Sequence, residues 1–417
     1  MSTSASSRVS AAAQLGLFVL LGLSGCSDGG DGAFARKAGL DGPPVALGPF
    51  LDGVFPVSTP NSAASATWSV TQAFPSLDLG DTLVISPNPA NDKLYVGTRD
   101  GLVRMFDNDP LVSTYEEFID LTDRAWAIWD GGFLGLIFHP EFGQPGSEFR
   151  NYFYVYYSSH CEIGPRPDGE GLQTDLTTCD TSVPKASTGG YFGAYLRLSR
   201  FEVPDDSTVG DPSSEKVMIN MRLYNGSHRG GGMVFRNDGY LYVTIGDQFR
   251  YETAQDIVNN LEGGTHRFAV DIANESGGSW SCPPGSHLPR RIYNTTDEIS
   301  GQHYCIPDDN PWLDVDGGNF EEYCSLGHRN PHRLARDPVT DYMWSGEIGQ
   351  STREEINLIF CGNNYGWPFR EGLVAGVRPE PSSYEGILTD PVIDFVRTEA
   401  RAIIGGYVYR GTRYPEL

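Results

Sequence analysis

Three short stretches set the pattern of this chain: Leu83-Val84-Ile85-Ser86-Pro87, Lys93-Leu94-Tyr95-Val96 and Leu102-Val103-Arg104-Met105-Phe106. Apolar and polar side chains alternate along them, and Gly, Asn, Asp and Pro lie in the connections. A hydrophobic period of two residues, interrupted by these turn-forming residues, is typical of β-strands joined by tight turns. The segment from Leu83 to Phe106 therefore predicts one small antiparallel sheet.

The same order of strands returns three times. The copies are Leu136–Pro140, Tyr152–Tyr157 and Tyr195–Phe201; Met233–Phe235, Tyr240–Thr244 and Phe268–Asp271; and Arg333–Ala335, Tyr342–Trp344 and Ile356–Ile359. Repeated meanders with almost no amphipathic helical stretches predict an all-β chain folded as a β-propeller. A β-sandwich with several hairpins is the alternative, but it explains the repeated order less well. Gly405–Gly411 predicts a strand of a fifth sheet.

The first residues predict export from the cytoplasm. Arg8 precedes an apolar stretch, Ala11 to Leu23, that is shorter than the roughly 20 residues of a transmembrane helix, which is typical of a signal peptide. Leu23-Ser24-Gly25-Cys26 resembles the bacterial lipobox, so we expect cleavage before Cys26 and a lipid on its sulfur. A plain signal peptide with a chance cysteine is the alternative.

The predicted domain organisation has three parts. Residues 1–25 are the lipoprotein signal peptide, and 26–66, rich in Gly, Asp, Pro, Ser and Ala, are a flexible tether. Residues 67–417 are the propeller. We expect the protein to be lipid-anchored in the cell envelope, in the periplasm or at the outer membrane.

The remaining cysteines predict disulfides. Setting Cys26 aside leaves six of the seven cysteines, an even number in a chain expected in an oxidising compartment. Sequence does not decide their connectivity. The pairing with the shortest loops is Cys161 with Cys179, Cys282 with Cys305 and Cys324 with Cys361.

The formal net charge of −24 and the pI near 4.6 argue against nucleic acid as a partner. Binding to phosphates needs a basic patch. Cations and neutral ligands are the expected partners, although acidity can also serve solubility alone.

Five segments, in order, resemble the glucose/sorbosone dehydrogenase family. They are Gly131–Pro140, His228–Met233, Tyr242–Asp247, Leu326–Pro331 and the series from Gly346 to Pro368. Members of this family are six-bladed propeller quinoproteins that oxidise sugars with pyrroloquinoline quinone (PQQ) and calcium. The resemblance implies that fold and that chemistry for this chain.

His228 is the candidate catalytic base, because His titrates near neutrality and the resemblance implies this role at its position. Asp247 follows as the partner that fixes the imidazole tautomer. Read from the residues alone, a His in a Gly-rich turn is more often a surface or loop-bridging residue than a catalytic one. An Asp at the end of a strand, such as Asp247, commonly forms an Asx turn.

Arg329 and Asn330 are the candidate quinone-binding pair, because a cation and an amide donor suit the carboxylates and reduced oxygens of PQQ. A turn whose arginine pairs with surface carboxylates is the alternative. Asp130 is placed by the resemblance where the sugar-oxidising branch has a Gln that faces substrate and quinone. An ionised carboxylate accepts hydrogen bonds but cannot donate them, which leaves the choice of substrate open.

Calcium is expected on backbone carbonyls, which this hard cation accepts as ligands. The resemblance implies Gly349 and Gln350 at the catalytic ion and Glu355 and Tyr365 at a second, structural ion. The acidic ligand that the resemblance requires after Trp367-Pro368 is missing around Ala375.

We therefore predict a PQQ- and calcium-dependent sugar dehydrogenase that passes electrons from an aldose or polyol to an acceptor in the envelope. The alternative is a non-catalytic binding module like the hedgehog-interacting-protein-like branch of the superfamily, which the Tyr-rich end of the chain and its additional cysteines favour. The resembling family continues beyond the equivalent of Leu417 with a sixth blade and more quinone-binding cations. We expect this chain to be part of a longer protein or an inactive truncated product.

Overall fold

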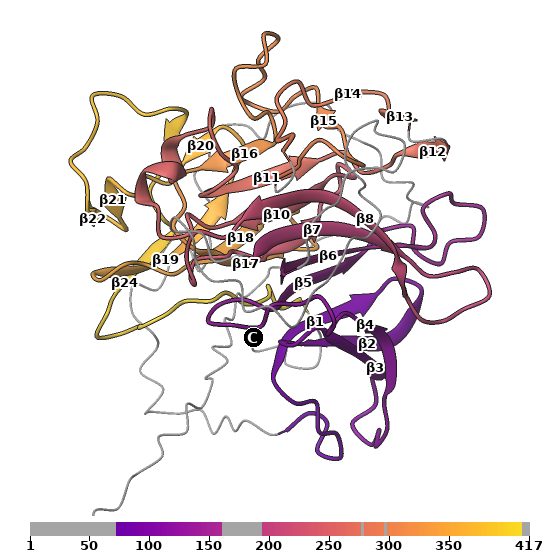
Figure 1. Ribbon diagram of the computed structural model, residues 1–417. Coiled ribbons are helices and arrows are strands. Elements are labelled where there is room, and N and C mark those ends of the chain that lie inside the picture. The colour runs from indigo at the N-terminus through magenta and orange to yellow at the C-terminus, as the bar shows by residue number, and fades with distance from the viewer. Residues whose placement is uncertain (1–71, 161–193, 277–278, 296–297, 411–417) are drawn as a thin grey trace, which may run out of the picture.

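The first sheet forms where the alternation predicts it. The computed structural model describes residues 72–160, 194–276, 279–295 and 298–410 (Figure 1). In it β1 (Thr82–Asn88), β2 (Asn91–Thr98), β3 (Leu102–Asp107) and β4 (Glu116–Asp120) pair antiparallel in chain order. Every second residue of β1 from Val84 onward is buried, as a strand with one face on the core requires.

The second sheet has the same order, with β5 (Phe133–Phe138), β6 (Tyr152–Ser159), β7 (Tyr195–Glu202) and β8 (Asp211–Arg222). Its middle strands are buried on both faces, because neighbouring sheets cover both sides. This explains why the sequence of β6 is a continuous aromatic run and not an alternation.

The third sheet shows one error in the prediction. Its main strands are β9 (Met233–Phe235), β10 (Leu241–Ile245), β11 (Gly264–Phe268) and β16 (Tyr323–Leu326), extended by the short β20 (Asn363–Asn364) and β23 (Ile387–Leu388). The predicted third strand, Phe268–Asp271, begins where β11 ends. Because Thr265 and His266 are polar, the sequence of β11 lacks the apolar pattern that predicts a strand. Both residues are nevertheless fully buried.

The fourth sheet contains β17 (Pro331–Arg336), β18 (Met343–Glu347), β19 (Arg353–Ile359) and β24 (Ile393–Val396). Short elements complete the described residues: the 3-10 helix η2 (Tyr251–Gln255), β12 (Ala273–Ser276), β13 (Ser279–Ser281), β14 (Ser286–His287), β15 (Ile306–Pro307), β21 (Arg370–Glu371) and β22 (Val374–Ala375). No helix among the described residues is long and apolar enough to span a bilayer.

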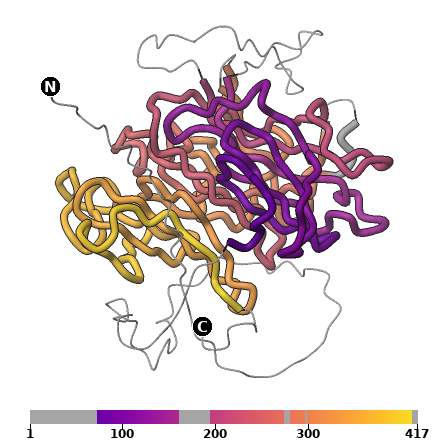
Figure 2. The backbone as a smooth tube through the Cα atoms, turned by 90° about the horizontal axis from the view of Figure 1, so that it is seen from below, coloured from indigo at the N-terminus to yellow at the C-terminus, as the bar shows by residue number. Residues whose placement is uncertain are grey.

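The four sheets are arranged radially as a β-propeller. Their first strands contact one another in chain order, β1 with β5, β5 with β9 and β9 with β17. The guanidinium of Arg333 on β17 donates to the carbonyls of Leu83 (2.8 Å) and Leu134 (3.0 Å), which joins the inner strands across the axis. Figures 1 and 2 show the sheets following one another around this centre. The number of six blades stays a prediction.

Aromatic side chains fill the space between neighbouring sheets. Tyr95 and Phe118 from the first sheet pack with Phe138 and Phe153 from the second, and the ring centroids of Phe118 and Phe153 are 5.0 Å apart. Sheets that radiate from an axis diverge outward, and large flat rings can close that gap.

The predicted strand at Gly405–Gly411 is wrong for the residues that the structure describes. No strand is assigned to residues 401–410, and Gly405 has a φ of +128°, which interrupts an extended conformation. This stretch lies against the first sheet, where the Tyr407 hydroxyl donates to the carbonyl of Ile85 at 3.1 Å.

Two of the three expected disulfides are confirmed. Cys282 is bonded to Cys305, and Cys324 on β16 to Cys361 after β19. The second bond therefore ties the third sheet to the fourth. Cys161 and Cys179 lie outside the described residues.

The Cys324–Cys361 bond is expected to stabilise the propeller. Replacing both residues by Ala should lower the free energy of unfolding by about 2–4 kcal/mol, because the bond restricts the unfolded chain. Denaturant unfolding of the variant and of the parent would measure the loss. Equal stabilities would contradict the expectation, and a Cys282→Ala/Cys305→Ala variant controls for loss of a disulfide outside this connection.

Candidate active site

The loop before β9 carries His228 in a backbone conformation that its neighbours enforce. His228 has a φ of +60°, and Gly230 and Gly231 follow with φ of +72° and +121°. A Cβ at Gly230 would lie 2.4 Å from the carbonyl oxygen of Thr244 on β10. The glycines thus let the loop lie directly on the sheet, which holds His228 at the end of the propeller where β9 begins.

His228 and Asp247 form a hydrogen-bonded pair. His228 Nδ1 lies 2.6 Å from Asp247 Oδ1, and the carboxylate also accepts the Phe249 N–H (2.8 Å) and the Trp367 indole N–H (2.7 Å). Because the Asp247 carboxylate is fully buried and accepts hydrogen bonds from three donors, it holds the His228 imidazole in one orientation. The imidazole then carries its proton on Nδ1, and Nε2, which bonds to no described residue, is left as the acceptor.

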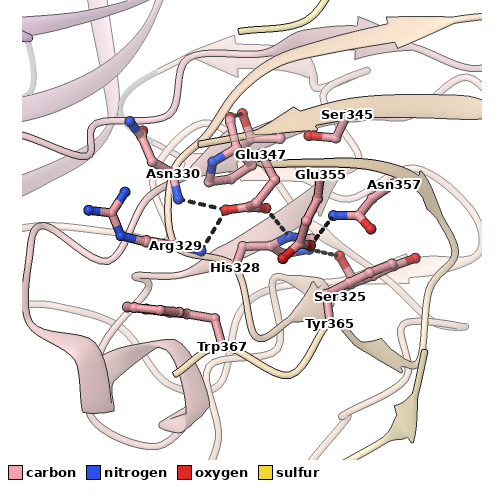
Figure 3. Close-up of polar contacts among 12 residues, drawn as sticks. Ser325, His328, Arg329, Asn330, Ser345, Glu347, Glu355, Asn357, Tyr365 and Trp367 are labelled. Carbon is pink, nitrogen blue, oxygen red and sulfur yellow. Dashed lines mark hydrogen bonds and ion pairs between the residues drawn. The ribbon is translucent and has the colours of Figure 1, made fainter. Parts of the chain in front are cut away.

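Arg329 and Asn330 are placed by a buried glutamate. Glu347 Oε1, at the end of β18, accepts both backbone N–H groups at 2.7 and 2.6 Å, and Glu347 Oε2 lies 2.8 Å from His328 Nδ1 (Figure 3). One carboxylate therefore shapes the turn that presents both side chains.

The Arg329 side chain is held in a partly aromatic setting. Its Nε lies 3.1 Å from Gln350 Oε1 and its Nη1 2.7 Å from the Ile348 carbonyl, and its guanidinium lies over the rings of Phe249 and Trp367. Burial lowers the pKa of Arg329, and the nearby Asp247 carboxylate opposes this effect. The group stays a fixed cation.

Asn330 joins this turn to the His228 loop, since its Oδ1 accepts the Gly230 N–H at 3.2 Å. Its amide nitrogen makes no hydrogen bond to any residue that the structure describes. The Asn330 amide therefore has donors to offer a ligand.

Asp130 lies beside the same loop. Its Oδ2 accepts the His228 backbone N–H at 3.2 Å. The neighbouring Arg229 side chain is buried, and its three guanidinium nitrogens find no hydrogen-bond partner within the described residues. Burial lowers the pKa of Arg229 to about 10, against the raising effect of Asp130. Arg229 is thus a cation that sequence reasoning missed.

Gly349 and Gln350, the residues expected at the catalytic calcium, lie in a tight turn. A Cβ on Gly349 would be 1.6 Å from the Arg353 carbonyl oxygen, so only glycine fits there. The Gly349 carbonyl lies 3.5 Å from the Arg397 guanidinium, and Gln350 contacts Arg329 through its side chain. Among the described residues, no three His, Cys, Asp or Glu side chains form a group suited to a metal ion.

Glu355 and Tyr365, expected at the second calcium, are engaged in the interior (Figure 3). The Glu355 carboxyl accepts the N–H of Gly372 (2.5 Å) and the amide of Asn357 (3.1 Å). The Tyr365 hydroxyl donates to the Leu358 carbonyl at 2.6 Å, and its ring stacks on His328. Burial, together with Glu347, raises the pKa of Glu355 to about 8. These side chains have structural partners, and a calcium on their carbonyls stays a prediction.

The structure thus brings together five predicted residues, His228, Asp247, Arg329, Asn330 and Asp130, on loops at one end of the propeller. Sequence reasoning missed Glu347 and Trp367, which lie inside the segments that carry the resemblance. The signal that would have found them is the residue type: a carboxylate that ends a buried strand and an indole N–H both need a partner.

The loops at one end of this β-propeller thus present a His–Asp pair beside an Arg–Asn pair. The family model described as Glucose / Sorbosone dehydrogenase matches residues 83–274 and 300–417. The chain belongs to this family.

Relatives are similar over most of this chain. HIPL2 protein of Arabidopsis thaliana is 27% identical over 319 residues, which are 72% of this chain and 43% of the relative. Aldose sugar dehydrogenase YliI of Escherichia coli is 27% identical over 295 residues, 70% of this chain and 61% of the relative. The chain spans about half the length of such curated relatives, 43%, 50% and 61% in three of them.

Solved structures agree on the fold. The soluble aldose sugar dehydrogenase of Escherichia coli in its apo form has a TM-score of 0.54 and 23% identity, covering 81% of this chain and 78% of that chain. A glucose dehydrogenase structure has a TM-score of 0.52 and 21% identity, covering 81% and 77%. These likenesses concern the fold alone.

Glu355→Gln is expected to flatten the pH dependence of stability. The pKa of the native carboxyl is raised to about 8, so its contribution to stability is complete below about pH 4.5 and is lost as the pH rises toward 8. Between these values the unfolded carboxyl ionises while the buried one stays protonated.

Urea unfolding in chelator at pH 5, 6, 7 and 8 would measure this effect. The stability of the parent should fall more steeply with rising pH than that of the variant. The exposed Glu399→Gln serves as control and should follow the parent. Parallel curves for parent and Glu355→Gln would rule out a protonated native Glu355.

Proposed function

We propose that the protein oxidises an aldose-type sugar or polyol at a CH–OH group, with PQQ and Ca²⁺ as cofactors. The observation that carries the proposal is the 2.6 Å bond from His228 Nδ1 to Asp247, which leaves Nε2 as a base beside Arg329 and Asn330. Membership of the sugar dehydrogenase family supports the class of reaction. A relative described as quinoprotein glucose dehydrogenase B supports the choice of cofactor.

The base removes the hydroxyl proton of the sugar. As the C–H bond breaks with its electron pair, the O–H proton passes to His228 Nε2, and the carbon becomes a carbonyl or lactone carbon. PQQ, when bound, supplies the ortho-quinone that takes the hydride. Asp247 stabilises the resulting imidazolium, since its carboxylate already accepts the Nδ1–H.

The donors present fit an anionic quinone. Arg329 is a fixed cation and Asn330 has an uncommitted amide, so both would hold carboxylates or reduced quinone oxygens. Asp130 would accept a sugar hydroxyl. We assign to Ca²⁺ the carbonyls of Gly349 and Gln350, and to a second Ca²⁺ those of Glu355 and Tyr365.

The proposed setting is the cell envelope. A lipid on Cys26 would hold the tethered propeller at the membrane, where an external electron acceptor would reoxidise the quinone. A non-catalytic binding module is the competing function. A binding module would not require the fixed orientation that Asp247 imposes on the His228 imidazole, so this orientation favours the enzyme.

Dye reduction by the protein with PQQ, Ca²⁺ and a panel of aldoses would test the proposal. His228→Ala should lower kcat by about 10²–10⁴-fold, the usual contribution of a general base, while PQQ binding is retained. Arg329→Ala should weaken PQQ binding itself. His287→Ala, a histidine paired with Asp308 away from the site, is the matched control.

Two outcomes would contradict this scheme. No PQQ binding by the parent would reject the quinoprotein function in favour of a binding module. Full turnover by His228→Ala would show that another group is the base.

Calcium dependence can be tested separately. Removing divalent cations with a chelator should abolish dye reduction, and added Ca²⁺ should restore it, since a cation on backbone carbonyls would help to polarise the quinone. The measurement is the initial rate before and after each addition. An undiminished rate in chelator would overturn the assignment of calcium to Gly349 and Gln350.

A further inference from the structure

A cavity of about 570 Å³ lies between the first and second sheets, at the end of the propeller opposite to His228. Its last lining residue, Thr208, precedes β8, which begins at Asp211 and ends after 12 residues at Arg222. The Arg222 carbonyl accepts the side-chain amide of Gln248, beside the candidate active site. A strand of this length spans roughly 35 Å, so the cavity is separate from that site.

The buried part of the lining is apolar. It contains side chains from the first sheet and from the connections after β5 and β7, namely Tyr95, Met105, Phe118, Val203 and the half-buried Phe142. Aromatic faces attract the C–H groups of a ligand. Pockets of about 300–1,000 Å³ with such a lining bind small organic molecules. The cavity therefore suits a small ligand in size and in lining.

The charged side chains of the lining are paired with one another. Lys93 Nζ lies 3.3 Å from Glu116 Oε1, and Arg150 Nη2 lies 2.8 Å from Asp205 Oδ1. These two cations and two anions balance, in a chain whose formal net charge is −24. Because an ionic ligand would meet no excess of opposite charge in this lining, the cavity favours a neutral one.

Three polar groups of the lining have hydrogen-bonding capacity to offer a ligand. The Tyr95 hydroxyl accepts the Asn91 amide at 3.3 Å and donates to none of the described residues. Asn151 donates its amide to Asp205 at 2.6 Å, while its Oδ1 accepts from no group in the described part of the chain. Among the same residues the Thr208 hydroxyl has no partner. A donor, an acceptor and a hydroxyl that can act as either match the hydroxyls of a sugar.

We propose that this cavity is a second, non-catalytic site that binds a neutral saccharide of one or two rings. The ring C–H groups would pack on the apolar lining, and the hydroxyls would bond to Tyr95, Asn151 and Thr208. The described residues that line the cavity include no histidine or cysteine, so the site would bind a sugar without transforming it. The inference does not depend on the proposed oxidation.

Calorimetric titration of the full chain with maltose, cellobiose and trehalose tests the inference. At least one of these neutral disaccharides should bind, and glucose 6-phosphate and glucuronate should bind more weakly, because the paired charges favour neither anion. Cosedimentation with insoluble starch or cellulose, with and without the free disaccharide, would distinguish the end of a glycan chain from a free sugar. Either source agrees with the inference.

Variants of the lining locate the binding. Thr208→Trp, at an exposed position, should fill the cavity and weaken binding at least tenfold. Asn151→Ala should weaken it about three- to tenfold, the net value of one hydrogen bond. Val209→Trp is the matched control: Val209 is the next residue, is 39% exposed and does not line the cavity, so the affinity should stay that of the parent. Dye reduction should be unchanged in all three.

The outcomes separate the two proposals. Absence of binding by the parent, or an unchanged affinity in Thr208→Trp, would refute the saccharide site. Loss of binding in His228→Ala but not in Thr208→Trp would place the sugar at the other end of the propeller, and would refute it too. Failure of dye reduction alone would reject the proposed oxidation, and the titration would still decide on this cavity.

Discussion

The buried carboxylate of Asp247 is the interaction on which this end of the propeller depends. A charge without solvent must be compensated by donors, and Asp247 is compensated by His228, the Phe249 N–H and Trp367 Nε1. These donors come from three separate parts of the chain. The backbone N–H of Asp247 also donates to the Arg329 carbonyl at 2.8 Å. One carboxylate thereby connects the candidate base His228 to the turn that carries Arg329 and Asn330.

Two further buried carboxyl groups, those of Glu347 and Glu355, lie close to the turn that carries Arg329 and Asn330. Glu347 holds the backbone of Arg329 and Asn330 and lies opposite Glu355 in the ladder of β18 and β19. Two carboxylates this close in a buried setting cannot both ionise easily, which agrees with the raised pKa of Glu355. Both carboxyl groups accept backbone N–H groups, and the raised pKa of about 8 favours the protonated form of Glu355 at neutral pH.

Much of the fold was predictable because its signals are local. Alternation identified the strands of the first sheet, and the aromatic run identified β6 in the second. Prediction failed at β11, whose buried residues are polar, and at Gly405, whose φ of +128° interrupts an apparently regular strand. In both places a long-range contact overrides the local pattern.

The sequence by itself determined the all-β class and the motifs that contain His228, Asp247, Arg329 and Asn330. It predicted disulfides but left their connectivity open, and the structure pairs Cys282 with Cys305 and Cys324 with Cys361. Only the tertiary structure decided that Trp367 caps Asp247 across 120 residues and that Arg229 lies buried beside Asp130. It also decided that the exposed rings of Trp129 and Phe249 lie against the loop that carries His228. The period of apolar residues and the residue types in a turn determine only the local structure of a few neighbouring residues. Hydrogen bonds between sheets depend on how those sheets dock around the axis, and no local pattern encodes that docking.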